Sequence, residues 1–367
     1  MTPGSAPADL RPLTALRFFA AAWVALYAFW PNLDVAVVPT LVTKGYLGVE
    51  LFFVLSGFIL SHVYLAAHGE KRFSYGTFLW ARIARVYPLH VATLIGVGVL
   101  GLAAVALGMA IDGNILSWPS LPANLLLLHA WGLAPQAGWN HSSWSISAEW
   151  FAYLAFPAFA FVAWRLRDRP VLALVGAAVF MIGLYAAFEA LAGFSLTEAT
   201  IRWGALRIVP CFALGCALYL VHRRSSLPRP GWISAACVLA MAVAGSLGTP
   251  DGVVVLFGGG LILALASLPN TGWLASRPAV YLGEISYAVY MVLVPWQLLA
   301  VNLAARVSGA EDKKLQLFVW LAVVLALPIV AAIAYHLVEH PARRALRGLA
   351  ERRADRNRQR QQAAQLA

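Results

Sequence analysis

The stretch "ALRFFAAAWVALYAFWP", residues 15–31, is the clearest indication of the fold. Before Pro31, every side chain in it is apolar or aromatic except that of Arg17. About 20 such residues in a helix cross the roughly 30 Å hydrocarbon core of a bilayer, so we predict a membrane span over residues 14–33. The tryptophans in this span and the many apolar segments after it distinguish it from a cleaved signal peptide, and we predict that it is retained.

The whole chain has the composition of a multi-pass membrane protein. Of its 367 residues, 61% are hydrophobic and only 12% are charged, against about 25% charged in soluble domains. We predict an all-α polytopic bundle of ten membrane helices in a single domain, residues 1–341, followed by a basic tail, residues 342–367. The predicted spans are residues 14–33, 45–66, 88–110, 145–164, 171–193, 204–221, 231–248, 252–268, 284–304 and 315–337.

The net charge of +11 follows the rule that cytoplasmic loops are rich in Lys and Arg. With both termini in the cytoplasm, most of the 27 Lys and Arg residues fall on the cytoplasmic side of the predicted spans. The expected partner is therefore a lipid bilayer rather than nucleic acid, and the basic tail is expected to touch anionic lipid. Cys211, Cys216 and Cys237 lie in apolar stretches, which indicates neither a disulfide framework nor a metal site.

Ionisable residues in membrane spans are costly and therefore mark candidate sites. Arg17 is one, and Ala28 follows it on the same helix face about 16 Å away, so the two positions could serve opposite ends of one elongated ligand. The structural alternative for Arg17 is a snorkelling arginine at the membrane surface. Arg82 and Arg85 share a helix face, either as ordinary positive charges of a cytoplasmic loop or as a pair of planar groups for phosphate oxygens.

A second set of polar residues is predicted at the outer ends of the spans. Glu50 begins the second span, where it could orient a base. Ser145 and Glu149 are four residues apart and can face one cavity at the start of the fourth span. The tryptophans around them could also form an interfacial aromatic belt. The candidates for contact with an acceptor in this stretch are Ser145, Trp144 and Asn140.

Together with Arg17, five motifs occur in the order and spacing of the acyltransferase 3 family, integral membrane acyltransferases of bacterial surface glycans and of some secondary metabolites. The chain resembles this family from Leu13 to about Arg344. The motifs are "GVELFFVLSGFIL" (48–60), "RIARVYP" (82–88), "SWSISAEW" (143–150), "LGEISYAVYMVLVP" (282–295) and "YHLVEHPAR" (335–343).

The resemblance implies transfer of an acyl group, often acetyl, from cytoplasmic acyl-CoA to a hydroxyl of a glycan or similar acceptor outside the bacterial cytoplasmic (inner) membrane. Arg82 and Arg85 match the family's R-x-x-R motif, which is associated with the acyl donor. Arg17 matches the arginine of its R-x10-H motif, and Glu149 matches the glutamate after its W-S motif. The resemblance implies acetyl-CoA as co-substrate and no metal; a homo-oligomer stays open.

One family position differs in this sequence. The family has a histidine, its general base, where this chain has Ala28. Either the histidine was replaced deliberately to trap a substrate-bound enzyme, which the intact remaining motifs favour, or this is a natural member with altered or absent catalysis. Glu50 or Glu149 would orient a histidine at that position or bind the hydroxyls of the acceptor. We expect the chain as written to bind acyl-CoA with little turnover. The alternative function is a transporter or flippase of a lipid-linked saccharide.

Overall fold

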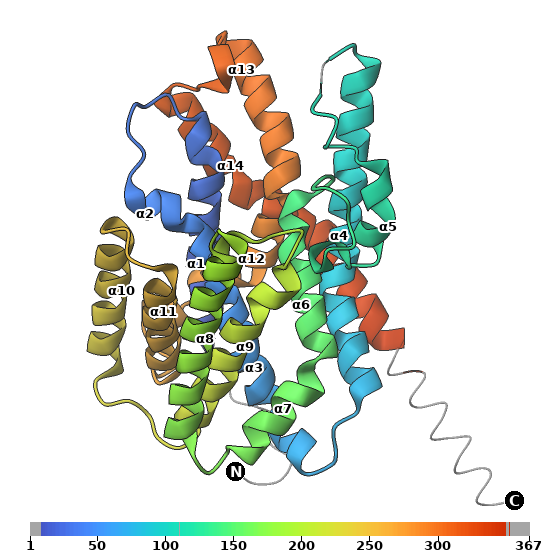
Figure 1. Ribbon diagram of the computed structural model, residues 1–367. Coiled ribbons are helices and arrows are strands. Elements are labelled where there is room, and N and C mark those ends of the chain that lie inside the picture. The colour runs from blue at the N-terminus through green and yellow to red at the C-terminus, as the bar shows by residue number, and fades with distance from the viewer. Residues whose placement is uncertain (1–8, 110, 350–351, 353–367) are drawn as a thin grey trace, which may run out of the picture.

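The computed structural model describes residues 9–109, 111–349 and 352, and within them it contains helices and no strand. Figure 1 shows most of the long helices gathered into one bundle. In chain order the α-helices are α1 (Arg11–Phe29), α2 (Thr40–Thr43), α3 (Gly48–Gly69), α4 (Tyr75–Ala106), α5 (Leu121–Leu125), α6 (Trp144–Leu154), α7 (Phe156–Arg165), α8 (Pro170–Ala192), α9 (Gly204–His222), α10 (Pro230–Ser246), α11 (Asp251–Ala266), α12 (Arg277–Trp296), α13 (Asn302–Ser308) and α14 (Leu317–Ala334).

The helices have the length and surface of a membrane bundle. Seven helical segments of the described chain are long and apolar enough to cross a bilayer, and α6 with α7 forms an eighth that is bent by 56°. The shorter apolar helices α10 and α11 pack on each other at one edge of the bundle, where two further spans were expected (Figure 1). Large apolar side chains such as Leu191 and Phe318 are more than four-fifths exposed, as expected of residues that face lipid. The all-α membrane class is confirmed, while the count of ten spans and the cytoplasmic termini stay predictions.

Two predicted boundaries were wrong. The span expected at 88–110 belongs to α4, which begins earlier, at Tyr75, so Arg82 and Arg85 lie on a helix, as their predicted shared helix face requires. Pro88 lies inside this helix, since membrane helices tolerate a proline where their neighbours re-satisfy the freed backbone groups. The span expected at 145–164 is broken instead of continuous, because Pro157 lacks the N–H that would extend the hydrogen bonds of α6.

Glycines bring α3 and α9 into backbone contact. A Cβ at Gly57 would lie 2.1 Å from the carbonyl oxygen of Phe212, and a Cβ at Gly215 would lie 2.0 Å from that of Val54. Helices in a membrane associate mainly through such close packing of small residues. Gly57 is therefore a packing residue, and this contact fixes the position of the neighbouring Ser56 on α3.

The last helix extends beyond its apolar part. After α14 the chain passes through a π-helical segment, Tyr335–Glu339, and stays helical to residue 349. The indole Nε1 of Trp80 on α4 donates a hydrogen bond to the carbonyl oxygen of Leu346 (2.8 Å), which fastens this extension to α4. Residues 342–349 of the predicted tail are thus helical, and residues 350–351 and 353–367 lie outside the described residues.

The close contact between α3 and α9 predicts what happens when one of its glycines is replaced by a larger residue. Gly215→Leu should separate α3 from α9 and lower the melting temperature of the purified protein, because overpacking costs about 1–3 kcal/mol or more. Thermal unfolding in detergent measures this. Gly183→Leu is the matched control, since nothing lies within 4 Å of a Cβ at that position on α8. Equal melting temperatures for both variants would contradict the proposed packing role.

Candidate active site

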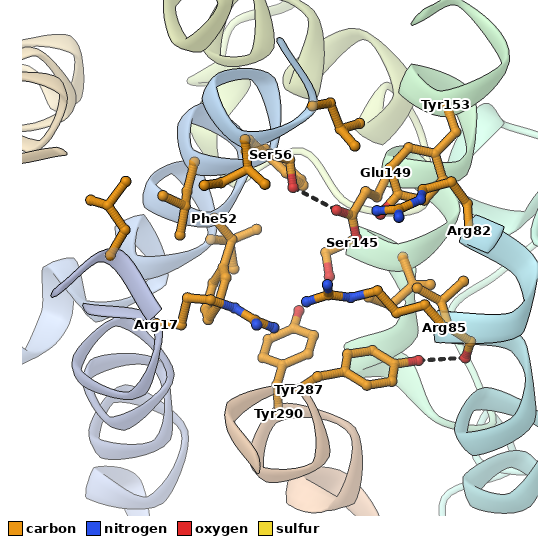
Figure 2. A pocket seen from close by; sticks show the side chains of 18 of the residues that line it. Arg17, Phe52, Ser56, Arg82, Arg85, Ser145, Glu149, Tyr153, Tyr287 and Tyr290 are labelled. Carbon is orange, nitrogen blue, oxygen red and sulfur yellow. Dashed lines mark hydrogen bonds between the residues drawn. The ribbon is translucent and has the colours of Figure 1, made fainter. Parts of the chain in front are cut away.

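A cavity of about 200 Å³ lies between α1, α3, α4, α6 and α12. It unites five of the residues singled out in the sequence, and Figure 2 shows the side chains of Arg17 and Arg85 reaching into it from opposite walls. Four other predicted site residues, Ala28, Glu50, Trp144 and Asn140, do not line it. Its polar lining consists of Thr14, Arg17, Ser56, Arg82, Arg85, Ser145, Glu149, Tyr153, Tyr287 and Tyr290.

The arginine Arg82 is held by aromatic rings rather than by a carboxylate. Its guanidinium carbon lies 5.8–5.9 Å from the ring centres of Tyr64, Phe78 and Tyr153. Its buried Nε has no hydrogen-bond partner. Cation–π contacts of this kind orient the guanidinium but leave its N–H groups free to donate.

The cavity arginines lack close counterions. Among the described residues, no carboxylate lies within 4.0 Å of Arg17, Arg82 or Arg85. Arg17 is repelled by Arg85 and attracted at longer range by Glu339 and Glu149. Guanidinium groups without partners in a cavity of low polarity are suited to binding an anion such as a phosphate.

The cavity also carries groups that can bind a hydroxyl. Glu149 on α6 accepts a hydrogen bond from Ser56 Oγ on α3 at 2.5 Å (Figure 2). Ser145 lies one turn before Glu149, as its four-residue spacing predicted, and lines the same cavity. Glu149 supplies the only carboxylate among the described lining residues.

Glu50 is buried in an ion pair outside the cavity. Arg207 on α9 donates to it twice, from Nε at 2.5 Å and from Nη2 at 2.9 Å. Arg207 also donates through Nη1 to the carbonyl oxygen of Ala199 (2.8 Å), and its guanidinium carbon lies 4.5 Å from the ring centre of Trp144. With the carboxylate of Glu50 occupied in this way, the pair holds α3, α9 and the start of α6 together.

Asn140 also lies in a structural contact. Its Nδ2 donates to Thr93 Oγ1 and to the carbonyl oxygen of Met291, both at 2.9 Å. Ser143 Oγ donates to the carbonyl oxygen of Asn140 (2.8 Å) and lies 3.2 Å from Nε2 of His129. Burial lowers the pKa of His129 to about 3, because the charged ring would lose its hydration, so this ring is neutral at physiological pH. These contacts join the segment before α6 to α4 and α12.

Ala28 lies near the opposite end of α1 from the cavity. The single helix α1 confirms that it follows Arg17 by three turns. The carbonyl oxygen of Ala28 accepts a hydrogen bond from Nε2 of Gln297 (2.9 Å). Gln297 is the first residue of a second π-helical segment, Gln297–Val301. Such segments are rare and occur frequently at functional sites.

The sequence reasoning missed several residues of the site. Arg207 was not singled out, although it lies inside the predicted span 204–221, and an arginine in an apolar span is the signal that marked Arg17. Tyr287 and Tyr290 were quoted within a motif without a role, yet both line the cavity, and Tyr287 donates to the carbonyl oxygen of Val86 at 2.6 Å. Their three-residue spacing on one face of an apolar helix could have revealed them.

The contribution of the buried ion pair between Glu50 and Arg207 to the stability of the protein can be tested by mutation. Glu50→Gln or Arg207→Gln should lower the free energy of unfolding by about 3–5 kcal/mol, because each leaves one buried group without its partner. The double variant Glu50→Leu/Arg207→Met should recover most of this loss, since it removes both charges. Thermal unfolding of the three variants checks the expectation, and single variants as stable as the unchanged protein would refute it.

Comparison with known proteins identifies the family of the chain. Residues 12–337 match the family described as "Acyltransferase domain". The chain is 31% identical to the acyltransferase MdmB of Streptomyces mycarofaciens over 334 residues, which cover 82% of this chain and 81% of that protein. It is 27% identical to the exopolysaccharide production protein ExoZ of Rhizobium meliloti (strain 1021) over 333 residues, 85% of this chain and 96% of that protein. No solved structure matches. This chain therefore belongs to the acyltransferase 3 family and is a membrane acyltransferase.

Proposed function

We propose that this acyltransferase moves an acyl group, with acetyl the leading choice, from acyl-CoA to a hydroxyl of a glycan or similar acceptor. The observation that carries the proposal is the cavity in which three arginines without close counterions face Glu149 and Ser145. The exopolysaccharide production protein ExoZ supports a saccharide acceptor through its name, and a bacterial cytoplasmic membrane is the proposed location.

The donor would enter from the end of the bundle that carries Arg82 and Arg85. Its phosphates would accept charge-assisted hydrogen bonds from these arginines, with Arg17 assisting across the cavity. The cavity of about 200 Å³ is smaller than the roughly 300–1,000 Å³ pockets that enclose drug-sized ligands. It would therefore take only the part of the donor next to the arginines, while the narrow pantetheine arm runs on toward position 28, about 16 Å from Arg17, and the adenosine stays outside.

The reaction joins the acceptor oxygen to the acyl carbon and breaks the bond between that carbon and the sulfur of CoA. The proton of the acceptor hydroxyl must leave during attack and ends on the CoA thiol. A histidine at position 28 would take this proton, whereas Ala28 cannot. Because Glu50 is occupied by Arg207, Glu149 is the proposed glutamate that binds the acceptor or orients a base. Family membership favours this transfer over the transporter alternative.

Replacing the donor arginines tests the donor assignment. Arg82→Gln and Arg85→Gln should each weaken binding of acetyl-CoA by about 10- to 100-fold, the value of one or two charge-assisted hydrogen bonds. Isothermal titration calorimetry on the purified chain gives the dissociation constants. Arg165→Gln is the control, because this exposed arginine lies against Phe161 on α7, away from the cavity. Unchanged affinity in both cavity variants would rule out the donor site.

Restoring a base tests the role of position 28. Ala28→His should raise acyl transfer or acetyl-CoA hydrolysis by about 10²- to 10⁴-fold, the usual contribution of a positioned general base. Release of the free CoA thiol from labelled acetyl-CoA measures turnover. Tyr27→His is the matched control, since it adds the same ring to the neighbouring, more exposed position of α1. Equal activity of the two histidine variants would contradict the assignment.

A further inference from the structure

A row of charged residues continues from the cavity along the extension of α14. Glu339, Arg343 and Arg347 follow one another at intervals of four residues, so they share one helix face. Glu339 is 2% exposed, and its segment Tyr335–Glu339 packs on α4 and α12, two of the helices that line the cavity, so the row begins next to the cavity. Its Oε1 lies 4.0 Å from Arg343 Nη1, and its buried Oε2 has no hydrogen-bond partner.

The row is held against the helix that carries the donor arginines. Trp80, two residues before Arg82, donates to the carbonyl oxygen of Leu346, the residue before Arg347. Arg347 accordingly lies close enough to Arg343, Arg82 and Arg85 to be repelled by all three. The arginines of the α14 extension and those of α4 therefore form one positively charged patch outside the cavity.

This patch has too little negative charge of its own. In the described part of the chain, Arg343 has Glu339 at 4.0 Å, and no carboxylate lies within 4.0 Å of Arg82, Arg85 or Arg347. Like charges held together beside an apolar bundle repel one another, and a bound anion with several charges would relieve this repulsion. Planar guanidinium groups brought together in this way suit phosphate oxygens.

We propose that Arg343 and Arg347 bind the 3′-phosphate on the ribose of the CoA donor. This subsite rests on the proposed function. With the diphosphate at the arginines of the cavity and the pantetheine arm running on toward position 28, the ribose with its 3′-phosphate lies on the other side of the diphosphate, outside the cavity. The arginines follow the same order: Arg82 and Arg85 line the cavity, whereas Arg343 and Arg347 lie beyond it. A phosphate monoester carries nearly two negative charges and needs more than one cation.

The experiment compares two donors that differ only in this phosphate. Acetyl-CoA and 3′-dephospho-acetyl-CoA are titrated by calorimetry into the full chain in nanodiscs of zwitterionic lipid. Arg343→Gln and Arg347→Gln should weaken binding of acetyl-CoA by about 10- to 100-fold and leave the affinity for the dephospho donor within about twofold. Arg344→Gln is the matched control, because it removes the same charge from an exposed neighbouring position on another helix face.

Each outcome has one meaning. An equal loss of affinity for both donors, or no loss for either, would overturn the 3′-phosphate subsite while the donor site itself stands. A second series in nanodiscs that contain phosphatidylglycerol distinguishes a CoA phosphate from the phosphate of a lipid headgroup. An effect of the variants that appears only with this lipid would assign the patch to lipid headgroups. If the unchanged protein binds neither donor in either lipid, the proposed function fails and this subsite with it.

Discussion

The buried ion pair between Glu50 and Arg207 is the interaction on which the arrangement of the site depends. Removing two charges from water is expensive, and the cost is offset here because the carboxylate and the guanidinium meet in two parallel hydrogen bonds. The remaining groups of Arg207 bind the carbonyl oxygen of Ala199 and the face of Trp144. One side chain thus connects α3 and α9 to the first turn of α6, the helix that carries Ser145 and Glu149 into the cavity.

Arginine serves two opposite purposes in this molecule, and its partners distinguish them. Arg207 is saturated by Glu50, a carbonyl and a ring, so it stabilises the fold and has little left to offer a ligand. Arg82 is oriented by aromatic rings that leave its donors available. A site for anions in a membrane bundle requires this second kind of support, since a carboxylate partner would compete with the substrate for the same N–H groups.

The fold class and the residues that line the cavity were predictable because both depend on patterns between residues close together in the sequence. Apolar runs mark membrane helices, and the spacing of Arg82 with Arg85 and of Ser145 with Glu149 places each pair on one helix face. The role of Glu50 was not predictable in this way. Its partner lies 157 positions later in the chain, and nothing in either local sequence indicates the pairing.

The ends and breaks of helices were harder to predict from the sequence, because hydropathy does not report them. Hydropathy reports where a helix enters lipid, so it missed the polar first turns of α4 that carry the donor arginines. It also passed over the break at Pro157, because the flanking residues are equally apolar on both sides. The separation of Ala28 from Arg17 follows from the rise of one helix, whereas the set of helices that encloses the cavity around Arg17 depends on packing that no single helix determines.

The π-helical segment Tyr335–Glu339 affects the direction in which Arg343 and Arg347 project from the helix. Each residue added to a helix turns everything after it by about 100° relative to what comes before. A π segment holds one residue more than the α-helical turn it replaces, so it acts as a rotational offset built into the chain. The side of the bundle on which Arg343 and Arg347 emerge is thereby chosen by backbone geometry several residues upstream, independently of the apolar pattern that seats α14 in the membrane.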